Sequence, residues 1–491
     1  MALLLQVLLM LYIIIGGTRA SVYISLGCTA VSLIVALFVA TKKSGGAYKL
    51  IWVFIILLFP VLGGLLYLFF NFQKSSKRVL DKIGENTERL EPYFESSEET
   101  LQTAMQHDIA HAPLMSYLQK SAGYPIYKAS DHRYFSPIED MMPTLLAALE
   151  KAEKFIFLEY FIVENGIMWS SVLDILERKA AEGVDVMLMY DDMGCFTLLP
   201  YDYPNYLESK GIKCRIFNPF RPVLTSTQNN RDHRKICVID GEIAITGGFN
   251  FADEYINEDK NRGYYWKDSA IIFDGNSARA FTLIFLQLWE LQDDRGFDMS
   301  LLPPLRDDLR VGYMQPYADC PSDNEDVCEA VYLDIIKSAR KYVYIVTPYL
   351  IFDENFIYAL GHAAKSGVDV RIITPEIGDN KFIHFVTRSY YKELLEDGVK
   401  IYEYRRSFVH SKLFVSDDSI ASVGTANLDF RSLYLQFECG LLLYGTQGVM
   451  SVKDDFLKTL EKCKPIRDKD CKAGPFKTLL QHIFKLFSPL M

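Results

Sequence analysis

Two uncharged apolar runs, residues 21–40 and 50–70, stand near the start of the chain. Each is about 20 residues long, which is enough for a helix to cross a hydrocarbon core of ~30 Å. Pro60 lies inside the second run, and transmembrane helices tolerate proline. The pattern therefore predicts two membrane-spanning helices. A shorter apolar run over 2–17 is left open as a third span, an interfacial segment or a signal peptide.

Further along, short strand-like apolar runs alternate with helical stretches, and the whole order repeats. Runs rich in Phe, Ile, Val and Tyr begin the two copies at 155–163 and 342–351, and they predict buried strands. The helical stretches end at glycine, the usual C-terminal stop, at Gly183, Gly211, Gly367 and Gly398. The alternation predicts an α/β fold made of two duplicated domains that pack as a pseudo-two-fold pair.

The same pattern divides the chain into four parts. We expect a membrane anchor over 1–72, a charged helical linker over 73–120, a first α/β domain over 121–300 and a second over 301–491. The final segment, from Pro475 onward, places apolar side chains on one helical face with lysines between them. It is predicted to be either a packed terminal helix or a helix on the membrane surface, and the sequence leaves both open.

The motif His-x-Lys-x-x-x-x-Asp occurs once in each predicted α/β domain. Its members are His233, Lys235 and Asp240 in the first copy and His410, Lys412 and Asp417 in the second. Each copy is followed by a glycine-containing turn and an asparagine, Asn250 or Asn427. Because the copies occupy matching places in a duplication, they predict one site to which both domains contribute.

The spacing assigns different places to the motif residues. His and Lys are two positions apart, so on a strand they point to the same face. Asp240 is an odd number of positions from His233 and is followed by glycine, a strong hairpin-turn signal. We include Asp240 and Asp417 with the catalytic motif, but this parity favours a turn and scaffold role for both.

These residue types suit the cleavage of a phosphodiester. Two lysines can neutralise charge on the phosphate oxygens, and Asn250 and Asn427 can donate hydrogen bonds to them. One histidine can attack phosphorus while the other protonates the leaving alcohol. With this electrophilic help from the side chains, we expect neither a metal nor another cofactor. Asp268 and Glu438, in the strand-like runs after the motifs, are the candidates to orient the imidazoles.

Charge and cysteine usage narrow the partners. The formal net charge is −10, which weighs against DNA or RNA as a partner but not against an anionic lipid, for which a local basic patch suffices. The nine cysteines form no C-x-x-C pair, so a zinc site is not expected. Their odd number favours reduced thiols, and hence catalytic domains that face the cytoplasm.

At the twin motifs the chain resembles the phospholipase D superfamily and, within it, the bacterial cardiolipin synthases. The resemblance covers nearly the whole chain, through FPVLGGLLYLF, EYFIVENG, NRDHRKICVIDGEIAITGGFNFADEY, VTPYLI, FVHSKLF and GTANLDFRSLYLQFE. It implies that His233 is the nucleophile and His410 the acid and base. It also implies a phosphate cradle of Lys235, Lys412, Asn250 and Asn427. Gln436 departs from the asparagine that relatives often carry.

The resemblance implies that two phosphatidylglycerol molecules give cardiolipin and glycerol through a phosphohistidine. The implied place is the bacterial inner membrane, with several spans, phospholipid substrates and cytoplasmic catalytic domains. The alternatives are hydrolysis to phosphatidic acid, transfer to another acceptor alcohol, a membrane-tethered nuclease and a non-catalytic scaffold. The motif residues do not decide the acceptor, because acceptor choice lies in pocket shape.

Overall fold

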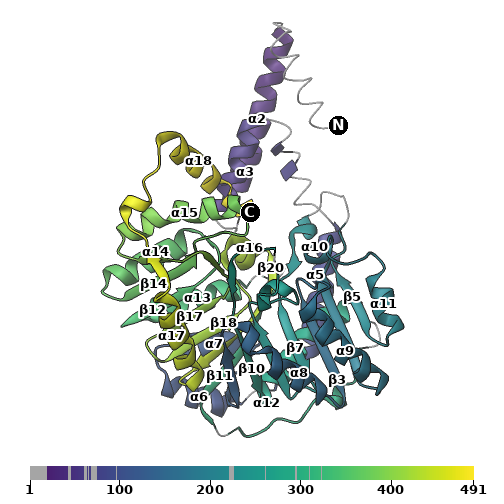
Figure 1. The fold of residues 1–491 in the computed structure, drawn as a ribbon. Helices are drawn as coiled ribbons and strands as arrows, with labels where there is room; N and C mark the ends of the chain where they lie inside the picture. Colours follow the sequence, from purple (N-terminus) through teal and green to yellow (C-terminus); the bar gives the residue numbers. More distant parts are fainter. Residues whose placement is uncertain are drawn as a thin grey trace.

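The structure is a computed structural model of the chain (Figure 1). It describes residues 19–490 apart from 43–45, 60–62, 65, 68–73, 96, 221–225, 260, 293–295, 309, 322 and 324. The apolar run over 2–17 lies outside the described residues. The body of the molecule is α/β, as predicted, with two sheets flanked by helices.

The smaller sheet has seven strands in the order β2-β10-β8-β7-β3-β4-β5. Its strands are β2 (His132–Phe135), β3 (Phe155–Tyr160), β4 (Asp185–Asp191), β5 (Lys213–Phe217), β7 (Lys235–Ile239), β8 (Ile243–Gly247) and β10 (Ala270–Asp274). Strands β3, β4 and β5 run parallel to one another, and β7 joins them antiparallel beside β3. We call the part from β3 to β10 the first repeat.

The larger sheet has ten strands, nine of them in the order β1-β11-β20-β18-β17-β12-β14-β15-β21, with β6 paired to β20. Its strands are β1 (Tyr127–Ala129), β6 (Arg231–Asp232), β11 (Arg310–Asp319), β12 (Tyr342–Val346), β14 (Asp369–Pro375), β15 (Lys400–Tyr404), β17 (Leu413–Ser416), β18 (Ile420–Gly424), β20 (Gln436–Tyr444) and β21 (Cys463–Pro465). The second repeat, from β12 to β20, follows the same strand order as the first repeat. This matching order confirms the predicted duplication.

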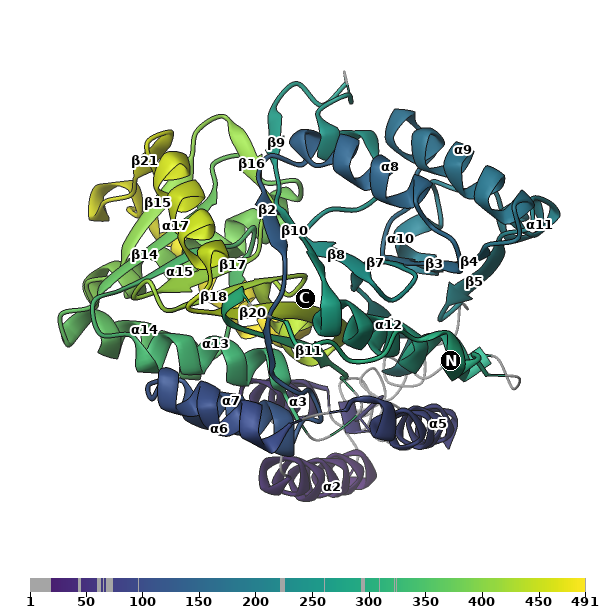
Figure 2. The same cartoon turned by 90° about the horizontal axis from the view of Figure 1, so that it is seen from below.

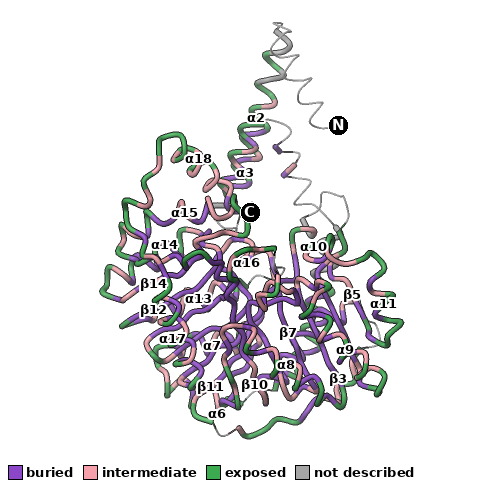
Figure 3. Tube along the Cα trace, in the orientation of Figure 1, coloured by how far each residue is buried: buried purple, intermediate pink, exposed green. Residues whose placement is uncertain are grey.

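Helices cover the outer faces of both sheets and fill the space between them (Figures 2 and 3). Those of the body are α5 (Lys74–Leu90), α6 (Glu98–His107), α7 (Ala112–Lys120), α8 (Met142–Glu150), α9 (Ile167–Ala181), α10 (Asp192–Cys195), α11 (Tyr203–Ser209), α12 (Gly275–Trp289), α13 (Val327–Ser338), α14 (Glu354–Lys365), α15 (Lys381–Glu396), α16 (Phe430–Tyr434) and α17 (Gln447–Leu460). The predicted glycine stops after α9, α11, α14 and α15 are confirmed, because all four glycines have positive φ.

Helix α12 joins the two repeats. Every one of its residues is buried, and it contacts β7, β8 and β10 of the first repeat as well as β11 of the larger sheet. A helix that is buried on all sides lies in the interior of a large domain. In Figure 2 the repeats lie side by side with β10 and β20 near their junction. The two repeats therefore share a hydrophobic core and are not independent domains joined by a linker.

The expectation of membrane-spanning helices is not supported by this structure. Helix α2 (Arg19–Thr41) covers the first predicted span and α3 (Gly46–Leu58) the start of the second. Over the described ranges, no helix combines the length and the apolarity that crossing a bilayer requires. Helix α3 has 13 residues. At a rise of about 1.5 Å per residue it is shorter than a hydrocarbon core.

The C-terminal segment forms helix α18 (Pro475–Leu486), and the helix predicted there is confirmed. It packs against α15, where the rings of Phe382 and Phe484 meet edge to face 4.7 Å apart. Phe476 and Leu479 on the same helix are exposed. Helices α2, α3 and α18 lie at the same end of the molecule (Figure 1).

Candidate active site

His233 lies on a segment that pairs with a strand of the second repeat. Strand β6, just before it, runs parallel to β20, with Arg231 opposite Gln436. The backbone N–H of His233 donates to the carbonyl of Phe437 at 2.9 Å. The backbone thus places the first motif histidine against the other repeat.

His410 shows the reverse arrangement. Strand β16 (Ser407–Val409), just before it, runs parallel to β9 (Tyr265–Lys267), with Val409 opposite Lys267. The backbone N–H of His410 donates to the carbonyl of Lys267 at 2.7 Å. Each histidine is therefore held by the repeat to which it does not belong.

The two orienting carboxylates are exchanged in the same way. Nδ1 of His233 lies 2.9 and 3.1 Å from the two carboxylate oxygens of Glu438. Nδ1 of His410 lies 2.7 Å from Oδ2 of Asp268. Both carboxylates are fully buried. When Nδ1 of an imidazole is engaged by a carboxylate, Nε2 is the nitrogen left for chemistry. The structure thus places both predicted carboxylates at the histidines, each across the repeat boundary.

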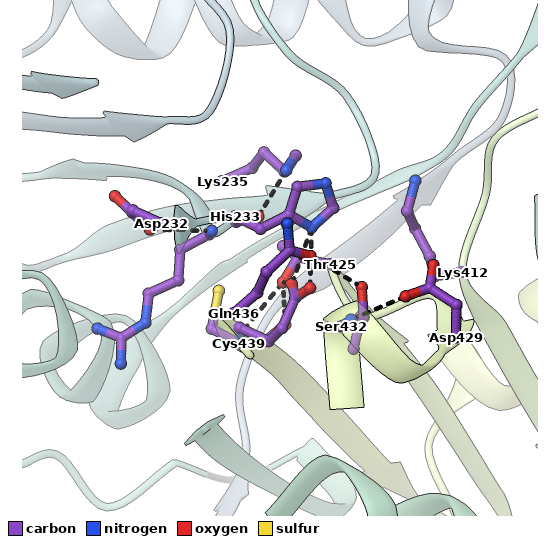
Figure 4. A network of polar contacts seen from close by, with 12 residues as sticks. Asp232, His233, Lys235, Lys412, Thr425, Asp429, Ser432, Gln436 and Cys439 are labelled. Atoms are coloured by element: carbon purple, nitrogen blue, oxygen red, sulfur yellow. Dashed lines mark hydrogen bonds and ion pairs between the residues drawn. The ribbon is translucent and has the colours of Figure 1, made fainter. Parts of the chain in front are cut away.

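The histidines share one electrostatic environment. The charges of Lys412 and Asp268, from the His410 side, act on the pKa of His233, and the charge of Lys235 acts on the pKa of His410. A cavity of about 340 Å³ opens at His233 and is lined by both repeats, including Asn427. Figure 4 shows His233 and Lys235 from the first repeat beside Lys412 from the second.

Both motif lysines lie next to their own histidines. Nζ of Lys235 donates to the carbonyl of His233 at 2.5 Å, and Nζ of Lys412 donates to the carbonyl of His410 at 2.5 Å. Nζ of Lys412 also lies 3.0 Å from Nε2 of His410. Burial lowers the pKa of Lys235 to about 8 and that of Lys412 to about 7. An incoming phosphate anion would stabilise the charged form of both lysines.

The imidazoles are neutral at pH 7 in the free protein. Burial, followed by the charges of Lys235, Lys412 and Arg431, holds the pKa of His233 well below its usual value. Burial and Lys412 lower the pKa of His410 to about 4, against the opposing pull of Asp268. A neutral imidazole is the form that can attack phosphorus.

The carboxylates behave differently from each other. Burial raises the pKa of Glu438 to about 7 despite the nearby Lys235. Burial also raises the pKa of Asp268, but His410 and Lys412 outweigh it and keep that pKa below its usual value. Asp268 is therefore ionised at pH 7, whereas Glu438 is close to half protonated.

The predicted asparagines occupy unequal positions. The Asn250 side chain is committed within the protein, since Oδ1 accepts from the N–H of Ile162 at 3.0 Å and Nδ2 donates to the Tyr255 hydroxyl at 2.6 Å. Asn427 lines the cavity, and its Oδ1 is buried without a hydrogen-bond partner among the described residues. Of the two asparagines, Asn427 is the one that borders the cavity.

The contacts of the two motif aspartates agree with the scaffold role that their parity favours. The Asp240 carboxylate accepts from the backbone N–H groups of residues 153–155, and the Asp417 carboxylate accepts from those of 340–342. Both aspartates have positive φ, as their turns require. Asp240 follows the far end of β7 from Lys235, about 17 Å along the strand. Both carboxylates thus join a turn to the start of a neighbouring strand.

Gly248 and Thr425 support the carboxylates, and the sequence argument did not assign them a role. The Thr425 hydroxyl donates to Oε2 of Glu438 at 2.5 Å. At the equivalent place in the first repeat, a Cβ on Gly248 would lie 2.1 Å from Oδ1 of Asp268. Both residues belong to the glycine-containing turns before the asparagines, which was the available signal.

Within the described ranges, no group of three or more His, Cys, Asp or Glu side chains is arranged to hold a metal ion. The polar surface of the cavity comes mostly from residues outside the motifs, Arg231, Arg431, Asp379, Asp429, Asn380 and Gln436. Gln436 accepts from the Ser432 hydroxyl at 3.2 Å, so the departure noted in the sequence is accommodated inside the second repeat.

Comparison with known proteins gives matches over nearly the whole chain. The family model described as cardiolipin synthase, PLD-like domain matches residues 145–289 and 332–460, one region in each repeat. A model described as phospholipase D-nuclease N-terminal matches 29–70. A cardiolipin synthase of Geobacillus sp. (strain WCH70) is 34% identical over 97% of this chain and 95% of its own length. A cardiolipin synthase of Alkalihalophilus pseudofirmus is 36% identical over 90% of this chain and 88% of its own.

Among solved structures, a phosphatidylserine synthase of Haemophilus influenzae Rd KW20 matches with a TM-score of 0.57. The match covers 75% of this chain and 97% of that one, at 14% sequence identity. At this identity the likeness concerns the fold alone.

Proposed function

Since the chain belongs to the cardiolipin synthase family of phospholipase D-like proteins, we propose that it transfers a phosphatidyl group from one phosphatidylglycerol to a second, releasing glycerol. One observation carries the proposal. Two histidine–carboxylate pairs, His233 with Glu438 and His410 with Asp268, are completed across the repeat boundary, and charged side chains beside each pair act on the pKa of the other histidine. That arrangement fits a reaction with one attacking and one proton-transferring imidazole.

In the first step, Nε2 of His233 attacks phosphorus while the bond from phosphorus to the headgroup glycerol oxygen breaks. His410 donates a proton to that oxygen, and glycerol leaves. With its lowered pKa, His410 is neutral in the free protein and must take up a proton when the substrate binds. The bound phosphodiester anion favours this uptake because it raises the pKa of a neighbouring imidazole. Lys235 and Lys412 neutralise charge on the equatorial oxygens, and Asn427 donates a hydrogen bond to them.

In the second step, a headgroup hydroxyl of another phosphatidylglycerol gives its proton to His410 and attacks the phosphohistidine. The phosphorus–nitrogen bond breaks, His233 returns to its neutral form, and cardiolipin is complete. The ionised Asp268 stabilises the imidazolium that forms on His410 in this step. The same residue thus serves as acid and then as base.

We further propose that the catalytic repeats work at the cytoplasmic face of a bacterial membrane, because donor, acceptor and product are all lipids. The α2 helix exposes Leu26, Ile34 and Leu37, and α18 exposes Phe476 and Leu479. Apolar side chains of this kind, at one end of the molecule, suit contact with a lipid surface.

The proposal is tested with the purified full chain in mixed micelles of phosphatidylglycerol labelled in both headgroup glycerol and phosphate. We expect cardiolipin and free glycerol in equal amounts, with little phosphatidic acid. His233→Ala and His410→Ala should each lower the rate by a factor of about 10³ or more. His362→Ala, on an exposed position of α14, is the matched control and should keep full activity.

Two outcomes would contradict the proposal. Phosphatidic acid as the main product would make the protein a hydrolase. Full cardiolipin production by either histidine variant would remove that histidine from the mechanism. Quenching with an alkaline denaturant, in which the phosphorus–nitrogen bond survives, adds a direct readout, because phosphate label should stay on the protein in the wild type and be absent from His233→Ala.

A further inference from the structure

Arg431 is a cation in the cavity wall that no described part of the protein engages. It lies in α16, is half-buried and lines the same cavity as His233 and Asn427. Its guanidinium makes no hydrogen bond or ion pair with the residues that the structure describes. Its charge nevertheless reaches the active centre, since it contributes to the lowered pKa of His233.

The other arginine of the cavity is already committed. Nε of Arg231 donates to the carbonyl of Gln228 at 2.8 Å, and Nη1 donates to the carbonyl of Asn218 at 2.8 Å. Arg231 is only 2% exposed, so it holds its loop in place. Lys235 and Lys412 stand at the histidines, where the reacting phosphate must lie. Among the described residues that line the cavity, Arg431 is the cation left for a second anion.

The acidic side chains of the wall do not neutralise Arg431. Asp379 accepts from the Tyr349 hydroxyl at 2.6 Å. Asp429 caps α16 by accepting from the N–H of Ser432 at 2.8 Å. Burial raises the pKa of Asp429 to about 6, with Arg431 acting only as a partly opposing charge. Both carboxylates therefore serve local hydrogen bonds.

The first repeat carries the opposite charge at the equivalent position. The spacing that relates Asn250 to Asn427 relates Glu254 to Arg431. Glu254 forms an ion pair with Arg262, and burial raises its pKa to about 7. The pseudo-symmetry of the backbone is thus broken in charge, and among the described residues the unpaired cation of this pair of positions belongs to the second repeat.

We propose that Arg431 binds the phosphate of the acceptor phospholipid, and so selects an anionic lipid over water or a neutral alcohol. The inference rests on the proposed function. The attacking hydroxyl and the acceptor phosphate belong to one glycerol headgroup, so that phosphate enters the same cavity as the hydroxyl. A guanidinium can hold two phosphate oxygens at once, which fixes the direction of the headgroup as well as its charge.

The test compares two acceptors with one donor, phosphatidylglycerol. Cardiolipin formation uses the anionic acceptor, and incorporation of labelled free glycerol into phosphatidylglycerol uses a neutral one. Both pass through the same first step. In Arg431→Gln, cardiolipin formation should fall by about 10- to 100-fold while glycerol exchange stays within about twofold. Arg431→Lys, which keeps the charge, should recover part of the cardiolipin rate.

Arg406→Gln, at an exposed position between β15 and β16, is the control and should change neither rate. Equal losses of both rates in Arg431→Gln would assign Arg431 to the donor phosphate and overturn the inference, as would no loss in either. The proposed function fails separately, if the wild type itself makes no cardiolipin.

Discussion

The active site consists of two half-sites, each made of one motif histidine and the carboxylate that contacts it. Their backbones are arranged alike, but the carboxylates and the turns beside them differ. In each, a histidine is held through its backbone by the opposite repeat and through Nδ1 by a buried carboxylate from it. The half-site of His410 uses the shorter Asp268, and Gly248 leaves room for it. The half-site of His233 uses the longer Glu438, and Thr425 adds a hydroxyl to hold it.

This difference gives the two imidazoles different proton chemistry. Asp268 is ionised and stabilises positive charge on His410, as an acid–base residue requires. Glu438 has a pKa of about 7, so it only partly stabilises positive charge on His233, which favours a neutral nucleophile. A duplicated backbone therefore does not impose equal roles, because the proton affinity of one buried carboxylate is enough to separate them.

Exchanging each carboxylate for its amide should reveal the largest difference between the two half-sites. We expect Asp268→Asn to lower kcat/KM for cardiolipin formation by about 10³-fold, because His410 loses the charge that stabilises its imidazolium. Glu438→Gln should cost only about 10-fold, since Glu438 is already close to half neutral at pH 7. Steady-state kinetics with thermal melting as the folding control measure both, and equal losses would contradict the assignment of roles.

Substitutions in the two turns give a smaller effect. Gly248→Ala would set a Cβ against Asp268, with 2.1 Å to Oδ1, so the carboxylate must turn away from His410. We expect about a 10²-fold loss of kcat, and about a 10-fold loss for Thr425→Val, which removes only a hydroxyl. Thr425→Ser keeps that hydroxyl and serves as the control. A Gly248→Ala protein with unchanged kcat would show that Asp268 needs no room there.

The pH profile should show the smallest effect. The pKa values of Lys412 and Lys235 are lowered to about 7 and about 8, so their charges are lost as the pH rises through these values. We expect kcat/KM to fall above about pH 7, and Lys412→Arg, which stays charged, to move this limb upward by roughly one unit, to the pKa of Lys235. The control is Lys392→Arg at an exposed position of α15. If Lys412→Arg left the alkaline limb at the same pH, the titration of Lys412 would not be the cause of that limb.

Much of this site was predictable from the sequence because the positions of its residues depend on short spacings along the chain. The paired His-x-Lys motifs predicted the duplication, and the strand order of the two repeats confirms it. The parity of Asp240 relative to His233 favoured a turn role, and its three backbone hydrogen bonds agree. Asp268 and Glu438 were found from their place in the next strand-like run.

The rest depended on contacts between distant segments. Which carboxylate meets which histidine follows from the pairing of β6 with β20 and of β9 with β16, and no local pattern reveals a pairing between repeats. The use of Asn250 by Tyr255 was hidden for the same reason. The predicted membrane spans rested mainly on the apolarity of two runs, which does not fix where a helix begins and ends, and α3 has 13 residues.

The strand exchange between the repeats makes each of them dependent on the other. A fragment carrying only the first repeat would keep His233 but lose Glu438, and a fragment carrying only the second would keep His410 without Asp268. Neither fragment would contain a histidine together with its orienting carboxylate. A substitution that unfolds one repeat therefore also removes the carboxylate that orients the histidine of the other repeat. The duplication does not give two independent active sites.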